Sequence, residues 1–291
     1  DRSYDVIHIN TGSFFTLFLC SLVSKLRGKK AKVIAHSHSV LTYCGAGQLS
    51  TAIAKPLWKY VADYYFACSL PAGEYMFPQK IIKSNRFKII RNAIDSDKFV
   101  YNKKVRQEYR DLLGVNEELL IGHVGRFVEA KNHKFLIRVF QRVYEKYPNA
   151  KLVLVGAGEL EEEVRQQVRS LGLEHVVLFL GQRRDVHKIM QALDILLLPS
   201  LREGLGVVAI EAQAAGLPVL TSTAVPLEAK VTDLFFQLPL DAGADKWADI
   251  ILEFWPKQVR GDTQQEIIKS GYDIKSSAKQ LEEFYKTLDM S

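Results

Sequence analysis

Residues 196–219 read Leu-Leu-Leu-Pro-Ser-Leu-Arg-Glu203-Gly-Leu-Gly-Val-Val-Ala-Ile-Glu211-Ala-Gln-Ala-Ala-Gly-Leu-Pro-Val219. An apolar run, a glycine-bearing loop, a helix-length segment and a second apolar run follow one another. This order predicts a strand, a loop, a helix and a further strand of a parallel sheet. Ligands of open parallel sheets bind at the carboxyl ends of the strands, so the loop at Glu203 is the first candidate for a ligand site.

Apolar runs of the same kind recur on both sides of this stretch. Most are rich in Val, Ile and Leu and do not alternate with polar residues, which is typical of strands covered on both faces. Helix-length segments lie between the later runs, so we predict an α/β fold with doubly wound parallel sheets. The predicted strands are 6–9, 32–35, 64–67, 87–90, 119–123, 152–155, 176–180, 195–198 and 218–221.

A charged, irregular stretch interrupts this alternation between residues 92 and 115, and a second series of strands follows it. A chain of 291 residues is long enough for two domains. We place the boundary near residue 104, which gives a first domain of residues 1–103 and a second of residues 104–274. Residues 275–288 carry the pattern of an amphipathic helix that could pack on either domain.

Charge is spread unevenly along the chain, whose net charge is +6. The first 103 residues hold 15 Lys and Arg against 6 Asp and Glu. This excess favours an anionic partner, such as a membrane surface, a phosphorylated lipid or nucleic acid, although a solvated basic face explains it as well. The three cysteines are far apart and suggest neither a disulfide framework nor a metal site. Their odd number and wide spacing fit a reducing, cytoplasmic setting best. No apolar run approaches the roughly 20 residues of a membrane span.

Glu203 and Glu211 are the two carboxylates of the deciding stretch. Side chains of a helix lean toward its amino end, so Glu211, about one turn into the helix, can face the same site as Glu203. An ionised carboxylate only accepts hydrogen bonds, which suits Glu211 to ribose hydroxyls and Glu203 to sugar hydroxyls. Alternatively, Glu211 only offsets the helix dipole. Gly204 and Gly206 would let a ligand approach, and a phosphate would be received by the backbone N–H groups of Leu205, Gly206 and Val207.

A second candidate cluster, Gly125-Arg126-Phe-Val-Glu-Ala-Lys131-Asn132, follows the first strand of the second series. Arg126 and Lys131 flank a strand-to-helix turn, where they could neutralise a diphosphate leaving group. Taken alone, the cluster could equally be a surface loop with ordinary charges. The Gly-Ala-Gly turn at residues 156–158 lacks the third glycine of a dinucleotide fingerprint and is better explained as a tight turn that lines a cleft.

Two histidines, His36 and His38, stand at the end of a predicted strand of the first domain. Their spacing places them on one side of the strand, but no nearby carboxylate or cysteine completes a metal site. We therefore predict no metal centre. A histidine that contacts substrate is the better interpretation, and we choose His38 because it lies farther toward the loop.

Together these motifs resemble the retaining glycosyltransferases of family 4, which have the GT-B fold of two Rossmann-like domains that face a cleft. The resemblance extends from residue 4 to about residue 288. It rests on Glu203 to Glu211 with the Gly-Leu-Pro-Val close, on the Gly125-Arg126 and Lys131-Asn132 pairs, and on Asn92-Ala-Ile-Asp95 followed by Phe99. The amino-acid sequence of residues 203–216 and of the Ala-His-Ser-His run most resembles that of bacterial capsular and exopolysaccharide enzymes.

The resemblance implies a nucleoside-diphosphate sugar as donor, UDP as its nucleotide, no obligatory metal or other cofactor, and retention of configuration. Arg126 and Lys131 would stabilise the leaving phosphate, which itself would help to deprotonate the acceptor, and Gly125 would let the donor approach the backbone. The turn that contains Gly181 and Arg183 would lie against the base. The family further implies that Glu211 contacts the ribose and that His38 lies beside the donor sugar.

Two further expectations concern the first domain. The helix at residues 275–291 would cross back onto it, and the strand and glycine-rich loop that open this domain in the family are missing from the chain. We therefore expect a partial acceptor-side domain and a chain that is inactive by itself. The acceptor would be a glycan or a lipid-pyrophosphate-linked glycan, with peripheral attachment to the inner face of the cell membrane through the basic first domain.

Three alternatives remain from the sequence. The chain could be a non-catalytic nucleotide-sugar-binding fragment or interaction module, because residues 104–274 look complete and the first domain does not. It could be another GT-B enzyme, such as an epimerase or a phosphorylase, although no lysine site for pyridoxal phosphate is recognisable. Nucleic-acid binding has little support, since no known module and no interleaving of aromatic and basic residues is visible.

Overall fold

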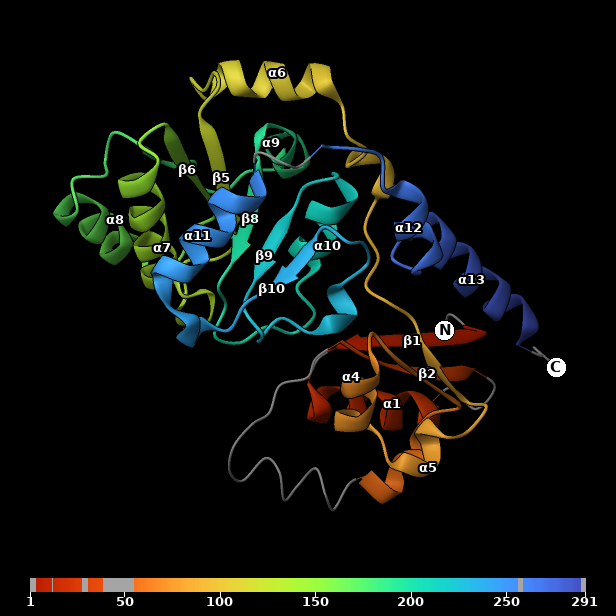
Figure 1. The fold of residues 1–291 in the computed structure, drawn as a ribbon. Helices are drawn as coiled ribbons and strands as arrows, with labels where there is room; N and C mark the ends of the chain where they lie inside the picture. Colours follow the sequence, from red (N-terminus) through yellow and green to blue (C-terminus); the bar gives the residue numbers. More distant parts are fainter. Residues whose placement is uncertain (1–3, 12, 28–30, 39–54, 256–258, 289–291) are drawn as a thin grey trace. The chain divides into compact units, whose positions relative to one another are not determined.

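The computed structural model describes residues 4–11, 13–27, 31–38, 55–255 and 259–288. The chain divides into two compact units (Figure 1). Unit 1 comprises Asp1–Ala93 with Ile274–Ser291, and unit 2 comprises Ile94–Asp273. The sequence placed the boundary near residue 104, but Ile94 and Phe99 are buried in the core of unit 2. Residues 94–103 therefore pack with the second unit.

Unit 1 is built on a four-stranded parallel sheet in chain order. Its strands are β1 (Val6–Thr11), β2 (Lys32–Ser37), β3 (Tyr64–Ala67) and β4 (Phe87–Ile89). One face is covered by α1 (Phe14–Arg27), α3 (Trp58–Val61), α4 (Leu70–Met76) and α5 (Gln79–Ile82), and Lys55–Leu57 forms the 3-10 turn η1.

The opposite face of this sheet is covered by α13 (Ile274–Thr287). Neighbouring strand residues point to opposite faces, and Tyr65 packs with Trp58 of α3 whereas Phe66 packs with Phe284 of α13. The predicted C-terminal helix thus belongs to unit 1. Residues 289–291 of that prediction lie outside the described residues, as does Cys44. Cys20 is exposed and Cys68 is buried.

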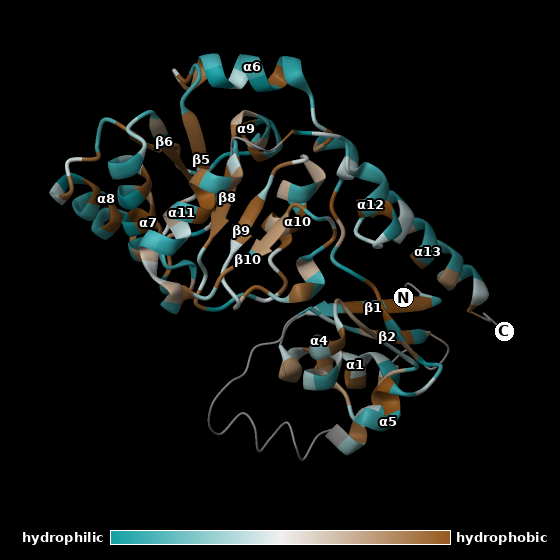
Figure 2. Cartoon of the chain, in the orientation of Figure 1, coloured by the Kyte–Doolittle hydropathy of each residue, from teal (hydrophilic) through white to brown (hydrophobic). Residues whose placement is uncertain are grey.

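Unit 2 is built on a six-stranded parallel sheet with the order β10-β9-β8-β5-β6-β7. The strands are β5 (Leu119–Val124), β6 (Ala150–Val155), β7 (Val177–Phe179), β8 (Ile195–Leu198), β9 (Val219–Thr221) and β10 (Phe235–Gln237). The strand β10 was not predicted from the sequence. Figure 2 shows the strands as hydrophobic and α6 as mostly hydrophilic.

Helices cover both faces of the unit 2 sheet. One face packs with α9 (Val186–Ala192), α10 (Val207–Ala214) and α12 (Gln264–Lys269), and the other with α7 (His133–Lys146), α8 (Glu161–Ser170) and α11 (Gly243–Phe254). The remaining elements are α6 (Lys103–Leu112) and the 3-10 turns η2 (Ser96–Lys98), η3 (Glu129–Lys131), η4 (Leu227–Ala229) and η5 (Leu240–Ala242). Both units therefore confirm the predicted class of parallel-sheet α/β domains.

The strand order places a topological switch point between β5 and β8. From β5 the chain adds β6 and β7 on one side, and then returns through α9 to add β8 on the other side. The loops that follow β5 and β8 consequently leave the sheet in opposite directions and open a crevice between them. These are the two loops that carry Arg126 and Glu203.

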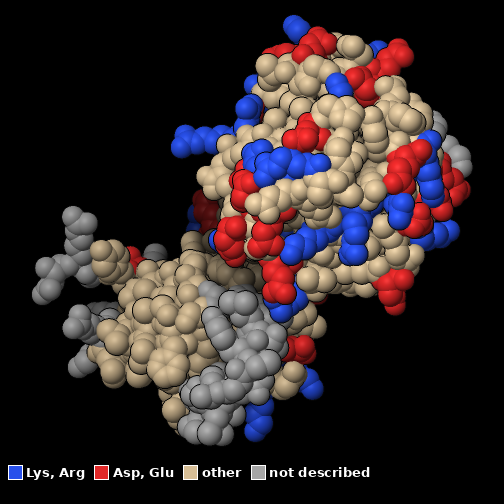
Figure 3. Space-filling model, turned by 90° about the vertical axis from the view of Figure 1, so that its left-hand side faces the viewer, with Lys and Arg blue, Asp and Glu red and all other residues tan. Residues whose placement is uncertain are grey.

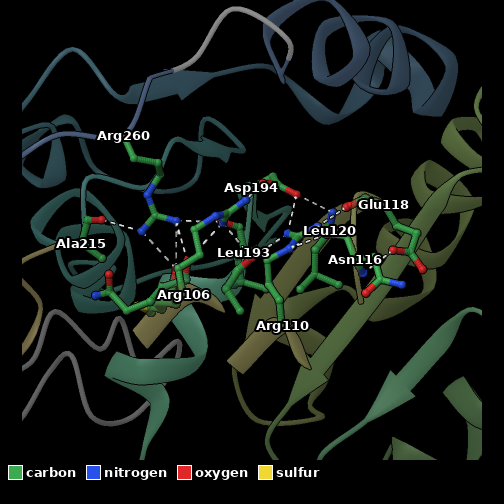
Figure 4. A network of polar contacts seen from close by, with 12 residues as sticks. Arg106, Arg110, Asn116, Glu118, Leu120, Leu193, Asp194, Ala215 and Arg260 are labelled. Carbon is green, nitrogen blue, oxygen red and sulfur yellow. Dashed lines mark hydrogen bonds and ion pairs between the residues drawn. The ribbon is translucent and has the colours of Figure 1, made fainter. Parts of the chain in front are cut away.

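Three arginines secure the opposite, amino edge of the same sheet (Figure 4). Arg106 and Arg110 of α6 bind the carboxylate of Asp194, at 2.5 and 3.2 Å, just before β8. The N–H of Leu120 also donates a hydrogen bond to Oδ2 of Asp194, at 2.7 Å. Arg260 donates to the carbonyl oxygens of residues 190, 191, 193 and 215. The network joins α6 to the starts of β5 and β8.

Acidic and basic side chains intermingle over the face of unit 2 that Figure 3 shows. On that face the charges of the sequence therefore form small mixed groups rather than one large patch. Within the described ranges, no helix is both long and apolar enough to cross a membrane.

Candidate functional site

The loops after β5 and β8 are held together at the switch point. The N–H of Leu201 donates to the carbonyl oxygen of Ala130 at 2.8 Å. The amide nitrogen of Asn132 donates to the carbonyl oxygen of Pro199 at 3.1 Å. Asn132 adopts a left-handed backbone conformation, with φ of 56°, before α7 begins. The sequence-predicted clusters at residues 125–132 and 203–211 are thus brought to one place.

Lys131 and Glu203 form an ion pair within this loop pair. The Lys131 Nζ lies 2.5 Å from Oε2 of Glu203, which also accepts a hydrogen bond from the Ser200 hydroxyl at 3.2 Å. Both charged side chains are largely buried, at 20% and 14% exposure. A largely buried charge needs a partner, so each compensates the other. The sequence assigned the two residues separately and did not foresee their pairing.

Arg126 differs from Lys131 in being exposed, and its guanidinium makes no hydrogen bond to the residues that the structure describes. Beneath it, the backbone of the β5 loop is in close contact with the β6 loop. A Cβ atom on Gly156 would lie 1.9 Å from the carbonyl oxygen of Gly125, and one on Gly158 would lie 2.4 Å from that of Phe127. The Gly-Ala-Gly turn therefore packs against the β5 loop, which leaves Arg126 free to reach an anion.

The helix α10 starts after Gly206, a position that only a residue without a Cβ atom occupies easily. Gly206 is its N-cap with φ of 75°, and a Cβ there would approach Val225 Cγ1 to 2.9 Å. Among the described residues, no acceptor binds the N–H groups of the predicted phosphate-binding positions. Free N–H groups at a helix start attract anions. These N–H groups belong to Leu205, Gly206 and Val207.

Glu211 is a half-buried acid that has no hydrogen-bond partner among the described residues. It lies one turn into α10, and no group in the described ranges hydrogen-bonds its carboxylate. Burial raises its pKa from 4.5 to about 7. A desolvated carboxylate with no hydrogen bond destabilises the fold, and such groups concentrate where ligands bind. Near pH 7 the side chain can accept from, or share protons with, a pair of hydroxyls.

The turn after β7 is engaged within the protein. Gly181 has a left-handed φ of 64°, and its carbonyl oxygen accepts a hydrogen bond from the N–H of Gly156 at 2.8 Å. The guanidinium of Arg183 binds both oxygens of Asp185, at 2.8 and 2.6 Å. This pairing, with the hydroxyl of Tyr109, holds the pKa of Asp185 far below its usual value. Contact of this turn with a base stays a prediction.

Two buried histidines beneath the β5 loop escaped the sequence analysis. His123 lies at the end of β5 and its Nδ1 donates to the carbonyl oxygen of Leu197 at 2.8 Å. His133 begins α7 and stacks on Phe127 with ring centroids 4.2 Å apart. Burial lowers the pKa of His123 to about 4 and that of His133 to about 2, so both rings are neutral. For His123, its place inside the apolar run of residues 119–124 was the available signal.

His38, the remaining predicted site residue, belongs to unit 1. Its Nδ1 lies 3.0 Å from Oδ1 of Asn92, and its Nε2 lies 3.0 Å from Oδ1 of Asn10. Asn10 is the polar residue near the end of β1, and this position was the signal that could have found it. No group of three metal-ligating side chains is present in the described part of either unit.

The chain resembles known proteins of one family. Residues 105–274 match the family described as "Glycosyl transferases group 1". The chain belongs to this family of glycosyltransferases. It is 32% identical over 292 residues to EpsF of Bacillus subtilis, a protein named as a glycosyltransferase, across 97% of this chain and 74% of EpsF. The prediction of a sugar-transferring enzyme is therefore confirmed.

A second relative has a name that includes a sugar nucleotide and a lipid-diphosphate-linked sugar. UDP-Gal:alpha-D-GlcNAc-diphosphoundecaprenol alpha-1,3-galactosyltransferase of Escherichia coli is 32% identical over 234 residues, which span 76% of this chain and 58% of that protein. Among solved structures, Anabaena HepE in complex with UDP superposes with a TM-score of 0.80 at 23% identity, covering 98% of this chain and 79% of HepE. Sucrose-phosphate synthase from Thermosynechococcus elongatus superposes with 0.73 at 20% identity, covering 98% and 74%. These likenesses confirm the predicted GT-B fold.

Proposed function

We propose that this chain is a retaining family 4 enzyme that transfers a hexose from a UDP-sugar to a glycan or lipid-diphosphate-linked glycan. The pathway we infer is the biosynthesis of a bacterial capsular or extracellular polysaccharide. The observation that carries the proposal is the unpartnered, desolvated carboxylate of Glu211 beside free N–H groups at the switch point. The names of the Escherichia coli galactosyltransferase and of the HepE complexes with UDP support the donor and acceptor classes.

Each part of the donor has a complementary group in this site. The vicinal hydroxyls of the ribose would bind Glu211, because an ionised carboxylate accepts two hydrogen bonds. The diphosphate would lie on Arg126, Lys131 and the N–H groups that open α10, which together offset the charge that develops on the leaving group. The base would lie near Gly181 and Arg183, and no cofactor is part of the proposal.

The ion pair of Lys131 and Glu203 gives this site a defined response to the donor. When a phosphate approaches, Lys131 can share its charge between the phosphate and Glu203 without leaving the loop. Glu203 then keeps one oxygen for Ser200 and Lys131 and offers the other to sugar hydroxyls. The leaving phosphate would take up the acceptor proton, so no protein group must serve as the base. Arg126 and Lys131 would hold that phosphate, and His38 would lie beside the sugar.

Calorimetric titration with UDP, GDP and UDP-sugars tests the nucleotide site. We expect UDP to bind the native chain and to lose about tenfold or more in affinity in Glu211→Ala, since a charged hydrogen-bonding group is worth about 1.5–3 kcal/mol. Glu174→Ala, an exposed carboxylate in the same unit, is the matched control and should bind UDP normally. Equal affinity of the native chain and Glu211→Ala would refute the assignment.

A non-catalytic nucleotide-sugar-binding module is the rival candidate. It shares the donor site and differs in lacking transfer. UDP release from a UDP-sugar, followed with and without glycan acceptors, separates the two. Turnover supports the enzyme, whereas tight donor binding without any UDP release over hours favours the binding module.

The partner that we propose for unit 1 is a phosphate-bearing lipid surface on the cytoplasmic side of the membrane. A hollow of about 340 Å³ lies at the amino ends of β2, β3 and β4. Asp63 in it is bound by Lys25 at 2.6 Å, and Arg86 is fixed on the carbonyl oxygens of residues 62 and 63. Lys32 and Lys59 also line the hollow, so cations outnumber the single carboxylate.

Vesicle sedimentation tests this partner. The native chain should sediment with vesicles of anionic phospholipid at low salt, less at high salt, and little with neutral vesicles, because each near-surface Lys or Arg contributes about 1 kcal/mol. The double substitution Lys32→Glu and Lys59→Glu should abolish the binding. The double substitution Lys230→Glu and Lys246→Glu, at two exposed lysines of unit 2, is the control of equal charge change. Sedimentation that does not depend on salt, or no sedimentation, would show that unit 1 does not bind a phosphate-bearing lipid surface through its cations.

A further inference from the structure

His123 is a fully buried polar side chain in the strand β5, whose other residues are apolar or glycine. The pairing of β5 with β8 ends at Gly122 and Leu196. The His123 ring makes the next link, because its Nδ1–H donates to the carbonyl oxygen of Leu197 at 2.8 Å. A carbonyl oxygen only accepts hydrogen bonds, so Nδ1 carries the proton of this neutral ring. The other ring nitrogen, Nε2, is therefore an acceptor.

The Nε2 atom of His123 is buried and has no hydrogen-bond partner among the described residues. Buried acceptors of this kind are rare and call for an explanation. The ring directs Nε2 toward the β5 loop, where a Cβ atom on Gly125 would lie 3.0 Å from it. The same Cβ would lie 3.5 Å from Cγ and Cδ of Lys131. The imidazole and the lysine stem thus flank the place that a side chain at Gly125 would fill.

Lys131 has hydrogen-bond donors to spare. Its ammonium carries three N–H groups, and within the described ranges only Glu203 accepts from it. In the proposed function the diphosphate of the UDP-sugar takes a second N–H. Burial, with a smaller contribution from the charge of Lys131, lowers the pKa of His123, so the lysine charge acts on this ring. A spare donor and an unpartnered acceptor therefore lie on the two sides of one glycine.

His133 is the alternative partner for Nε2 of His123. Its ring lies 4.7 Å from that of His123, centroid to centroid, with an angle of 78° between the ring planes. The face of the His133 ring is stacked on Phe127, which fixes its plane. In this position neither nitrogen of His133 is hydrogen-bonded to His123. The ring of His133 is thus held by packing, and Lys131 is the better candidate for the donor.

We propose that His123 is a positioning residue for Lys131, and that its Nε2 accepts a hydrogen bond from the ammonium when the diphosphate of the UDP-sugar binds. Phosphate, Glu203 and His123 then hold the ammonium from three sides and fix its direction toward the leaving group. The unpaired acceptor in an apolar strand gains its partner at this step. The inference rests on the proposed function, because it requires the diphosphate to lie on Lys131.

Calorimetric titration with UDP in a double-mutant cycle tests the coupling of the two residues. His123→Phe keeps a ring and removes the acceptor, so the affinity for UDP should fall about tenfold, as for a lost hydrogen bond to a charged group. In the Lys131→Met background the same substitution should change the affinity by no more than about twofold, because the ammonium is already absent. Equal losses in both backgrounds would overturn the inference alone. No binding of UDP by the native chain would refute the proposed function and the inference together.

Replacement of His123 by the two side-chain amides separates positioning from packing. Both His123→Gln and His123→Asn leave part of the site of the ring unfilled, and only the longer amide extends as far as Nε2. We expect His123→Gln to recover part of the UDP affinity that His123→Phe loses, and His123→Asn to bind as weakly as His123→Phe. Urea unfolding of all variants is measured in parallel. Affinities that follow the unfolding midpoints, instead of the acceptor at Nε2, would show that the ring only packs.

His133→Phe is the matched control. It replaces a second buried and unpartnered imidazole of the same cluster and keeps a ring to stack on Phe127. Its affinity for UDP should stay within about twofold of that of the native chain, because His133 has no part in holding the ammonium. If His133→Phe weakens binding as much as His123→Phe, the two rings support the loop together, and the specific pairing of His123 with Lys131 is refuted.

Discussion

In the unit 2 sheet, polar groups at the amino ends of the strands have hydrogen-bond partners, whereas several at the carboxyl ends have none among the described residues. At the amino edge, Arg106, Arg110 and Arg260 place most of their N–H groups on Asp194 and on backbone carbonyl oxygens, while Arg260 Nε has no partner among the described residues. At the carboxyl edge, Glu211 and the N–H groups that open α10 have no partner among the described residues. The same sheet thus shows that saturated polar groups support the fold, whereas unsaturated ones mark a place for a ligand.

The largest effect expected from this contrast is on the saturated edge. Asp194→Ala leaves two arginines and the N–H of Leu120 without their acceptor in a buried place. We expect the free energy of unfolding of unit 2 to fall by about 3–5 kcal/mol, as for a broken buried ion pair. Urea unfolding measures it. The exposed Asp249, paired with Lys146, is the control, and its alanine variant should lose no more than about 1 kcal/mol.

The second effect concerns Glu211 and pH. Its pKa is raised in the folded chain, so the folded state binds the proton more tightly, and the stability this gives is complete below pH 4.5 and lost as pH rises through about 7. Glu211→Gln removes this loss. Relative to the native chain, the variant should therefore gain up to about 3 kcal/mol between pH 4.5 and pH 8. The thermal-unfolding midpoints of the two proteins are measured across this pH range. A difference between them that does not change with pH would contradict the prediction.

A third, smaller effect separates the two cations of the β5 loop. Lys131→Met leaves Glu203 half-buried without its partner, which should cost about 1–3 kcal/mol in stability. Arg126→Met removes an exposed side chain and should change stability by no more than about 0.5 kcal/mol. Both should weaken UDP binding. If the two variants unfold alike, the ion pair does not stabilise the loop.

The smallest effect compares two glycines of the β8 loop. Gly206→Ala forces a side chain into a left-handed conformation near Val225, which should cost about 1 kcal/mol. Gly204→Ala meets open space and should be nearly neutral. Unfolding midpoints of the two variants decide between them, and a neutral Gly206→Ala would show that the start of α10 can rearrange.

Much of the fold was readable because its signal is local. Unbroken runs of Val, Ile and Leu predicted the buried parallel strands, and the glycine-bearing loop after 195–198 predicted the edge where ligands bind. The motifs of residues 125–132 and 203–211 were each predicted as a candidate ligand site, and the structure brings the two loops together. The ten residues before the boundary at 104 were misplaced, since Ile94 and Phe99 join unit 2 through contacts that leave no local pattern.

The sequence by itself thus determined the class of fold, the family and the two loops of the candidate site, because apolar periodicity and motif spacing act over a few residues. Only the tertiary structure decided the partners of the charged groups. Lys131 meets Glu203 across 72 residues, Arg110 meets Asp194 across 84, and His8 meets Tyr285 across 277. Such pairs depend on where whole strands and helices come to lie, and burial then sets their protonation, so neither can be deduced from neighbouring residues along the chain.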